Sequence, residues 1–247
     1  FDQDAVREKV IPTYMGLITQ VDDHLGRLFA FMAEQGRLED TLIVFSSDHG
    51  DYLGDHHLGE KELWHDAAIK VPLIVVDPSA AADHSRGTIN DELVEAIDLV
   101  PTFLDALGIP VDTDRLEGRS LLPAIHGDGM LPPREFIISE FDYSFRTASR
   151  VALERPTKDC TIVTVRDKRW KAVFCAGFRP LLYDLEADPA ELRDLGSDER
   201  YRALIEEYAR KVGEWSSGLK TKTSVSDSFV EDWLGFKRFQ GMKIGVW

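Results

Sequence analysis

The apolar positions of the chain form two short runs separated by a long polar loop. The first extends from Leu42 to Phe45 and the second from Val71 to Val76. Each run is too short for a buried helix and is rich in residues that favour strands. Near-continuous apolar runs of this kind are typical of strands covered on both faces, as in a parallel sheet. We therefore expect two buried strands within an α/β fold.

Segments with helical periodicity lie before and after these strands in the sequence. Apolar residues recur every three or four positions in three segments, which predicts amphipathic helices. Pro12 suits a first helical turn, so we expect the regular part of the first helix to begin near it. Pro101 lies inside the second segment and should end or kink the helix. The predicted helices cover residues 4–36, 92–107 and 200–215.

The last part of the chain has a different pattern. Pro132-Pro133 marks a boundary, after which short strand-like runs follow one another. Residues 167–169 are a predicted turn that joins two of these runs into a hairpin. We expect a small antiparallel sheet that is completed by the last helix. The strand-like runs are 136–141, 161–165, 170–174 and 181–185.

Asp48, His49 and Gly50 follow the first apolar run, where a strand would end. In open parallel sheets, ligands bind beyond the carboxyl ends of the strands. A carboxylate beside an imidazole suits a divalent metal such as Zn, Mn or Fe, and Ca less obviously. Both side chains reach one site only if the backbone bends, which Gly50 permits. The following loop supplies His56, a candidate for orienting the metal-binding loop. The alternative is that Asp48 caps a helix, and two ligands do not complete a metal site.

The longer string around this triplet indicates a family. SSDHGDYLGDH at 46–56, followed by Lys61 and by Lys70-Val71-Pro72, resembles the second metal-binding segment of the sulfatases and phosphonate monoester hydrolases of the alkaline phosphatase superfamily. The resemblance implies that Asp48 and His49 bind a divalent metal. It also implies that Lys61 contacts the oxyanion of the substrate.

The resemblance extends over most of the chain. It implies the C-terminal part of an alkaline-phosphatase-like αβα sandwich, followed by a small antiparallel sheet with a helix. Residues 1–145 would form the C-terminal half of the catalytic α/β domain, and residues 146–247 a small α+β subdomain with an aromatic tail. The matching segments are 14–28, 98–110, 116–127 and 182–191.

The nucleophile of this family has no counterpart here. Family members use a Cys or Ser in the pattern Cys/Ser-x-Pro/Ala-x-Arg, and the Cys is oxidised to formylglycine. The one look-alike, Cys175 to Arg179, has Gly177 in place of Pro or Ala and lies in a late hairpin, so we reject it. The resemblance therefore implies a longer enzyme, whose part before Phe1 would carry the nucleophile and the remaining metal ligands.

The composition limits the kinds of partner that this chain is expected to bind. The formal net charge of −15 argues against a nucleic-acid partner, which needs clustered Lys and Arg. No apolar run approaches the length of a membrane span, and the missing N-terminal Met leaves export open. Cys160 and Cys175 are expected to be reduced thiols. Aromatic residues crowd the tail at 220–247, where they would pack onto the same chain or onto a neighbouring subunit of a homo-oligomer.

We interpret the chain as part of a metal-dependent hydrolase of phosphonate monoesters, phosphodiesters or sulfate esters, acting on a small anionic substrate. His49 in place of Asn and the short spacing to Lys61 favour the phosphonate monoester or phosphodiester branch. The alternatives are an arylsulfatase proper, a phosphomutase of the same superfamily and a non-catalytic binding module. His126 is expected at the surface.

Overall fold

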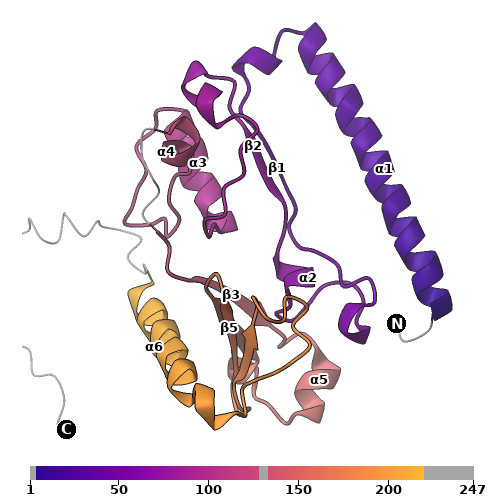
Figure 1. Cartoon of the computed structure of the whole chain (residues 1–247), viewed down its shortest axis with the longest axis vertical. Helices are drawn as coiled ribbons and strands as arrows, with labels where there is room; N and C mark the ends of the chain where they lie inside the picture. The colour runs from indigo at the N-terminus through magenta and orange to yellow at the C-terminus, as the bar shows by residue number, and fades with distance from the viewer. Residues whose placement is uncertain (1–3, 128–132, 220–247) are drawn as a thin grey trace, which may run out of the picture.

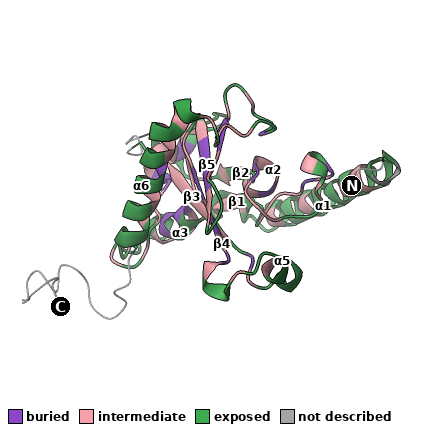
Figure 2. Ribbon diagram, turned by 90° about the horizontal axis from the view of Figure 1, so that it is seen from below, coloured by how far each residue is buried: buried purple, intermediate pink, exposed green. Residues whose placement is uncertain are grey.

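The first element is a long helix, α1 (Asp4–Glu34), which runs along one side of the molecule (Figure 1). The structure is a computed structural model that describes residues 4–127 and 133–219. The predicted helix over 4–36 is confirmed. It begins well before Pro12, so the expectation that the proline marks its first turn was wrong. Most of α1 is exposed (Figure 2).

The two apolar runs form strands, but they do not form a parallel sheet. β1 (Ile43–Ser46) and β2 (Leu73–Val76) pair antiparallel, with Ile43 opposite Val76. The intervening loop contains a short helix, α2 (Asp66–Ile69), and brings the chain back alongside β1. The expectation of parallel strands buried on both faces was therefore wrong for this chain, because an apolar run does not encode the direction of its partner.

Large apolar side chains are exposed on three neighbouring parts of the fold. Seven of them lie on α1, three on the β1–β2 pair, and others on and beside the helix α3 (Leu99–Ala106). Exposed apolar side chains therefore lie on the β1–β2 pair as well as on the helices beside it. The residues on the strand pair are Phe45, Ile74 and Val76.

The helix predicted over 92–107 is shorter than expected. A 3₁₀ turn over Ala96–Asp98 precedes α3, so Pro101 lies in the first turn of α3, where a missing N–H costs nothing. Glu95 and Asp98 cap this turn reciprocally, which fixes the start of the helix. A further helix, α4 (Leu122–His126), ends at His126, whose Nε2 lies 2.7 Å from Asp77. His126 is thus paired and partly buried rather than a free surface residue.

The predicted antiparallel sheet is confirmed. Its strands are neighbours in the order β3–β4–β5–β6, and the hairpin of β4 and β5 turns at 167–169 as expected. A short helix, α5 (Thr147–Ala152), connects β3 and β4, and α6 (Arg202–Gly218) follows the sheet. The strands are β3 (Ile137–Asp142), β4 (Thr161–Arg166), β5 (Trp170–Cys175) and β6 (Leu181–Asp184).

The core of the described chain lies at this sheet. Val165, Ala172 and Leu182 are fully buried and form one cluster with Tyr208 of α6. Figure 2 shows buried segments concentrated along these strands and the adjoining side of α6. A second cluster includes Tyr183, and Trp64 from the loop between β1 and β2 packs against it. The sheet therefore holds α6 by one cluster and part of the β1–β2 loop by the other.

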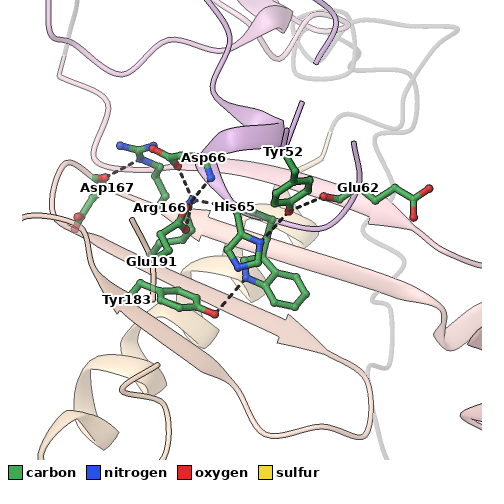
Figure 3. A network of polar contacts seen from close by, with 10 residues as sticks. Tyr52, Glu62, His65, Asp66, Arg166, Asp167, Tyr183 and Glu191 are labelled. Carbon is green, nitrogen blue, oxygen red and sulfur yellow. Dashed lines mark hydrogen bonds and ion pairs between the residues drawn. The ribbon is translucent and has the colours of Figure 1, made fainter. Parts of the chain in front are cut away.

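A buried ionic network attaches α2 to the sheet. Lys171 on β5 is 0% exposed, and its Nζ lies 2.5 Å from Asp66 Oδ1, 2.6 Å from Glu191 Oε1 and 3.1 Å from the Trp64 carbonyl oxygen. Arg166 on β4 donates to both carboxylate oxygens of Asp66, at 2.8 and 2.7 Å. Figure 3 shows Asp66, Arg166 and Glu191 converging where α2 meets the sheet. Two cations and two carboxylates therefore compensate one another.

The pKa of Asp66 reflects this pairing. Desolvation by burial pushes the pKa up, but the charge and hydrogen bond of Lys171, followed by those of Arg166, outweigh it and hold the pKa below its ordinary value. The Asp66 backbone N–H donates to Glu191 Oε2 at 2.6 Å, so α2 is held by its first residue through both main chain and side chain. The loop from β1 thus ends at a fixed point on the sheet.

Three other expectations concern parts away from this core. Cys160 and Cys175 are both free thiols, as predicted. The aromatic tail at 220–247 lies outside the described residues. Among residues 4–127 and 133–219, no helix combines the length and apolarity that a bilayer crossing requires.

Replacing Lys171 by Met should destabilise the protein by about 3–5 kcal/mol, because the buried Glu191 and the partly buried Asp66 would lose a shared cation. Denaturant unfolding of the full-length protein measures the change. Lys168 offers the matched control: its ion pair with Glu92 is 58% exposed on the lysine side, so Lys168→Met should cost less than about 1 kcal/mol. Equal losses in the two variants would show that the network does not anchor α2.

Candidate active site

The chain bends sharply after β1, and Gly50 is required for this bend. Its N–H donates to the carbonyl oxygen of Ala68 in α2 at 2.7 Å. A Cβ at this position would collide with the carbonyl oxygen of Ala67, so no other residue fits. The Ser47 hydroxyl donates to the His49 carbonyl oxygen at 2.8 Å and tightens the turn. Because α2 is attached to the sheet, the hydrogen bond from Gly50 also fixes the position of the residues just before Gly50.

Asp48 and His49 converge on one side of this bend. Asp48 Oδ2 lies 3.5 Å from His49 Nε2, and the two side chains are 84% and 37% exposed. His49 Nδ1 lies 2.7 Å from the Gly50 carbonyl oxygen, which can only accept, so Nδ1 carries the hydrogen. In the neutral imidazole, Nε2 then presents a lone pair. Two acceptor atoms thus face the same space, an arrangement that a divalent cation would stabilise.

The charge state of Asp48 suits a metal ligand. Desolvation raises the pKa of Asp48, but the hydrogen bonds from its own backbone N–H and from the His49 backbone N–H, together with the charge of Lys61, hold the pKa below its ordinary value. The carboxylate is therefore ionised at neutral pH, the form that binds cations. A single carboxylate and a single imidazole make a donor set that divalent Zn, Mn or Fe accepts.

No complete metal site is present within the described chain. Among residues 4–127 and 133–219, no three His, Cys, Asp or Glu side chains are grouped so that they could hold a metal ion. Asp48 and His49 thus fit such an ion as two of its ligands, and further donors would have to come from elsewhere.

Lys61 and His49 line the same cavity, which has a volume of about 310 Å³. The opposite wall is formed by the end of β3 and the turn that follows it, including Phe145, which is 92% exposed. Arg146 in this turn forms an ion pair with Glu62, the residue after Lys61, and both residues line the cavity. The three residues predicted from the sequence, Asp48, His49 and Lys61, therefore lie in one region.

His56 lies elsewhere. It lines a second cavity of about 520 Å³, together with His65, Tyr183 and Glu191. Its ring stacks on that of His65, with the centroids 3.8 Å apart and the planes at 22°. The proposed role of His56 in orienting the metal-binding loop would therefore act through His65 rather than through a direct contact with His49.

Sequence reasoning did not single out Tyr52 and His65, which hold the interior of the loop. The Tyr52 hydroxyl donates to the Glu62 carbonyl oxygen at 2.8 Å and lies 2.8 Å from His65 Nδ1 (Figure 3). Burial, then the charges of His56 and Lys171, lower the pKa of His65 to about 4. The only available signal was the presence of aromatic rings in an otherwise polar loop, and such rings usually indicate packing.

The nucleophile look-alike lies in a structural turn. Cys175 ends β5, and Gly177 adopts a positive φ of 79° in the turn toward β6. Arg179 forms an ion pair with Asp194 at 2.6 Å. Cys175 Sγ lies 3.8 Å from the Tyr143 hydroxyl within the sheet cluster. These surroundings are those of a packed hairpin end.

Comparison with known proteins identifies the family. Residues 1–109 match the family model described as Sulfatase, a segment that contains α1, both strands of the β1–β2 pair and the Asp48-His49-Gly50 bend. Residues 1–109 thus carry a sulfatase-family segment. The resemblance derived from the sequence is thereby confirmed.

Several relatives extend the match beyond residue 109. The chain is 38% identical over 217 residues to the "multifunctional alkaline phosphatase superfamily protein PehA" of Trinickia caryophylli, which covers 87% of this chain and 41% of the relative. It is 34% identical over 200 residues to an arylsulfatase of Clostridium perfringens, covering 81% of this chain and 38% of the relative.

A solved structure gives the same result. The phosphonate monoester hydrolase of Agrobacterium radiobacter superposes with a TM-score of 0.76 at 33% identity, over 83% of this chain and 40% of that one. The sulfatase-type fold expected from the sequence is therefore confirmed. The chain spans about two fifths of the length of the relatives it matches.

Burial of His65 predicts a pH dependence of the stability of this protein. The unfolded chain takes up a proton near the ordinary pKa of 6.5, whereas the folded protein takes it up only near 4. Between these values the folded state binds fewer protons, so stability is lost as the pH falls from 6.5 to 4, by up to about 3 kcal/mol.

Denaturant unfolding of the full-length protein across this pH window measures the effect. His65→Asn keeps a hydrogen-bond donor but cannot titrate, so it should flatten the pH dependence. His24→Asn, on the exposed surface of α1, is the matched control and should leave the dependence unchanged. The same slope in the wild type and in His65→Asn would refute the assignment.

Proposed function

We propose that the full-length protein is a metal-dependent hydrolase of phosphonate monoesters, phosphodiesters or sulfate esters, and that Asp48, His49 and Lys61 belong to its active site. The observation that carries this proposal is the convergence of Asp48 and His49 at the end of β1, with His49 and Lys61 on one cavity. Family membership supports it, because the relatives named above include an arylsulfatase and a phosphonate monoester hydrolase.

Asp48 and His49 would hold a divalent cation such as Mn, Zn, Fe or Ca through the carboxylate and Nε2. A bound cation would supply Lewis-acid polarisation of a nonbridging oxygen and activation of the nucleophile. The hydrogen bond from His49 Nδ1 to the Gly50 carbonyl oxygen fixes the ring so that Nε2 faces this position. The bend at Gly50 therefore serves to present two donors from adjacent residues.

Lys61 would stabilise the negative charge that grows on the transferred group or on the leaving oxygen. The charge of Lys61 helps to hold the pKa of Asp48 below its ordinary value, which supports a role for the ammonium beside the proposed metal ligands. The remaining ligands and the nucleophile, a hydroxyl or the hydrate of a formylglycine, would come from outside the described residues. In-line attack on phosphorus or sulfur then expels the ester oxygen.

The cavity beside Lys61 would receive the leaving group of a small anionic ester. Phe141 and Phe145 form part of its wall and would contact an apolar or aromatic alcohol. The phosphonate monoester or phosphodiester branch is the first candidate, since the Agrobacterium hydrolase superposes at 33% identity. An arylsulfatase is the second, favoured by the 34% identity to the Clostridium enzyme.

Lys61→Ala should lower kcat by roughly 10²-fold while leaving metal content unchanged, because the lysine acts on transition-state charge and not on the metal. The full-length enzyme is assayed on an aryl phosphonate monoester, an aryl phosphodiester and an aryl sulfate with Mn or Zn supplied. Lys158→Ala, at another exposed lysine, is the matched control and should keep normal turnover. Turnover of Lys61→Ala within twofold of the control would exclude the proposed role.

Asp48→Asn should lower the metal content of the purified full-length protein and abolish turnover, because the amide carries no charge for the cation. Metal analysis by mass spectrometry after dialysis measures the loss. Asp22→Asn, on the exposed surface of α1, is the control and should retain metal. Full metal occupancy in Asp48→Asn would contradict the proposed ligand role.

A further inference from the structure

Lys61 lies between two backbone groups that are bound by the same residue. The N–H of Tyr52 donates to the carbonyl oxygen of Glu60, immediately before Lys61, at 2.9 Å. The hydroxyl of Tyr52 donates to the carbonyl oxygen of Glu62, immediately after Lys61, at 2.8 Å. The main chain and the side chain of one tyrosine therefore donate hydrogen bonds to the residues on both sides of the proposed catalytic lysine.

The backbone of residues 60–63 has a conformation that is unfavourable without support from surrounding contacts. Glu60 and Leu63 adopt positive φ angles of 58° and 62°, in the left-handed region that side chains other than glycine disfavour. Such conformations persist where surrounding contacts impose them, and they cluster at functional sites. The two bonds from Tyr52 span this strained segment.

Tyr52 is itself held rigidly. It is 1% exposed, and its hydroxyl lies 2.8 Å from Nδ1 of His65. A tyrosine hydroxyl has one hydrogen, which goes to the Glu62 carbonyl oxygen, so His65 Nδ1–H is the donor and the Tyr52 oxygen accepts. His65 is 6% exposed, and His56 stacks on its ring. The chain of contacts runs from the stacked histidines through Tyr52 to the backbone around Lys61.

The tyrosine hydroxyl is not needed for packing. A phenylalanine would fill the same volume, and a buried hydroxyl without partners is unfavourable. Both partners of this hydroxyl belong to the loop that carries Lys61, one next to the lysine and one at the end of the loop. The hydroxyl therefore has a positional role in the loop rather than a role in the core of the sheet.

We propose that Tyr52 and His65 are positioning residues, which fix the backbone on both sides of Lys61 so that its ammonium group meets the substrate in one orientation. This proposal rests on the proposed function, since it gives a role to residues that act through Lys61. Neither residue is assigned a contact with the substrate. A lysine on a loosened loop would still reach the cavity, but over a wider range of positions.

The test uses Tyr52→Phe in the full-length enzyme, which removes the hydroxyl and keeps the ring. The expected result is a fall in kcat of roughly tenfold or more, with KM within about twofold and metal content unchanged, because misplacement of a catalytic group lowers the rate of the chemical step. Tyr208→Phe is the matched control. Tyr208 is equally buried, and its hydroxyl donates to Asp167 at 2.5 Å, but it lies on α6 and holds no part of the Lys61 loop. Equal effects of the two substitutions on kcat would overturn the proposal.

The double variant Tyr52→Phe with Lys61→Ala tests whether the tyrosine acts through the lysine. If it does, the double variant is no slower than Lys61→Ala alone. Additive losses would overturn the proposal even if Tyr52→Phe alone is slow. A protein in which Lys61→Ala has normal turnover would instead refute the proposed function of Lys61, so the two failures are distinguishable.

A second pair of variants covers the case in which Tyr52→Phe does not fold. Asn at position 65 can place an amide N–H near the position of the imidazole Nδ1, whereas Ala cannot. His65→Asn should therefore retain more of the wild-type kcat than His65→Ala, with thermal unfolding of both recorded alongside. The same kcat for His65→Asn and His65→Ala would overturn the proposal.

Discussion

The buried pairing of Lys171 with Asp66 and Glu191 is the constraint on which the candidate site depends. The loop between β1 and β2 contains little regular structure, and it would have no defined path without fixed points. Lys171 ties the start of α2 to the four-stranded sheet, and α2 in turn accepts the hydrogen bond from Gly50. The position of Asp48 and His49 thus depends on a charge pair that joins α2 to a distant strand. Removing one partner of such a buried network is costly, so the arrangement is held firmly.

Within this frame the loop combines rigid and exposed parts. Tyr52, His65 and Ala68 of α2 are buried, whereas Asp48 and Lys61 are exposed. This division is what a site for an anionic ester requires, because the reacting groups must meet the substrate while their backbone stays fixed. Several non-glycine residues of the loop have positive φ angles, so tertiary contacts here outweigh the backbone preference for negative φ.

Local patterns predicted much of the fold. The long periodicity of α1 and the turn at 167–169 between two strand-like runs are properties of neighbouring residues, and both were confirmed. The direction of pairing between β1 and β2 was predicted wrongly, since an apolar run reports burial but not which strand lies beside it. The start of α3 at Leu99 depended on the capping of Glu95 and Asp98, which periodicity alone does not show. The candidate residues Asp48, His49 and Lys61 were found because they occur in one short string, whereas the bonds of Tyr52 and the buried Lys171 arise only from tertiary packing.

The central claim is that Asp48 and His49 are metal ligands, and anomalous X-ray diffraction from crystals of the full-length protein grown with Mn or Zn tests it most directly. The account predicts an anomalous peak at coordination distance, about 2.0–2.3 Å, from a carboxylate oxygen of Asp48 and from Nε2 of His49. A metal bound at other residues, with Asp48 and His49 in contact only with solvent, would contradict it.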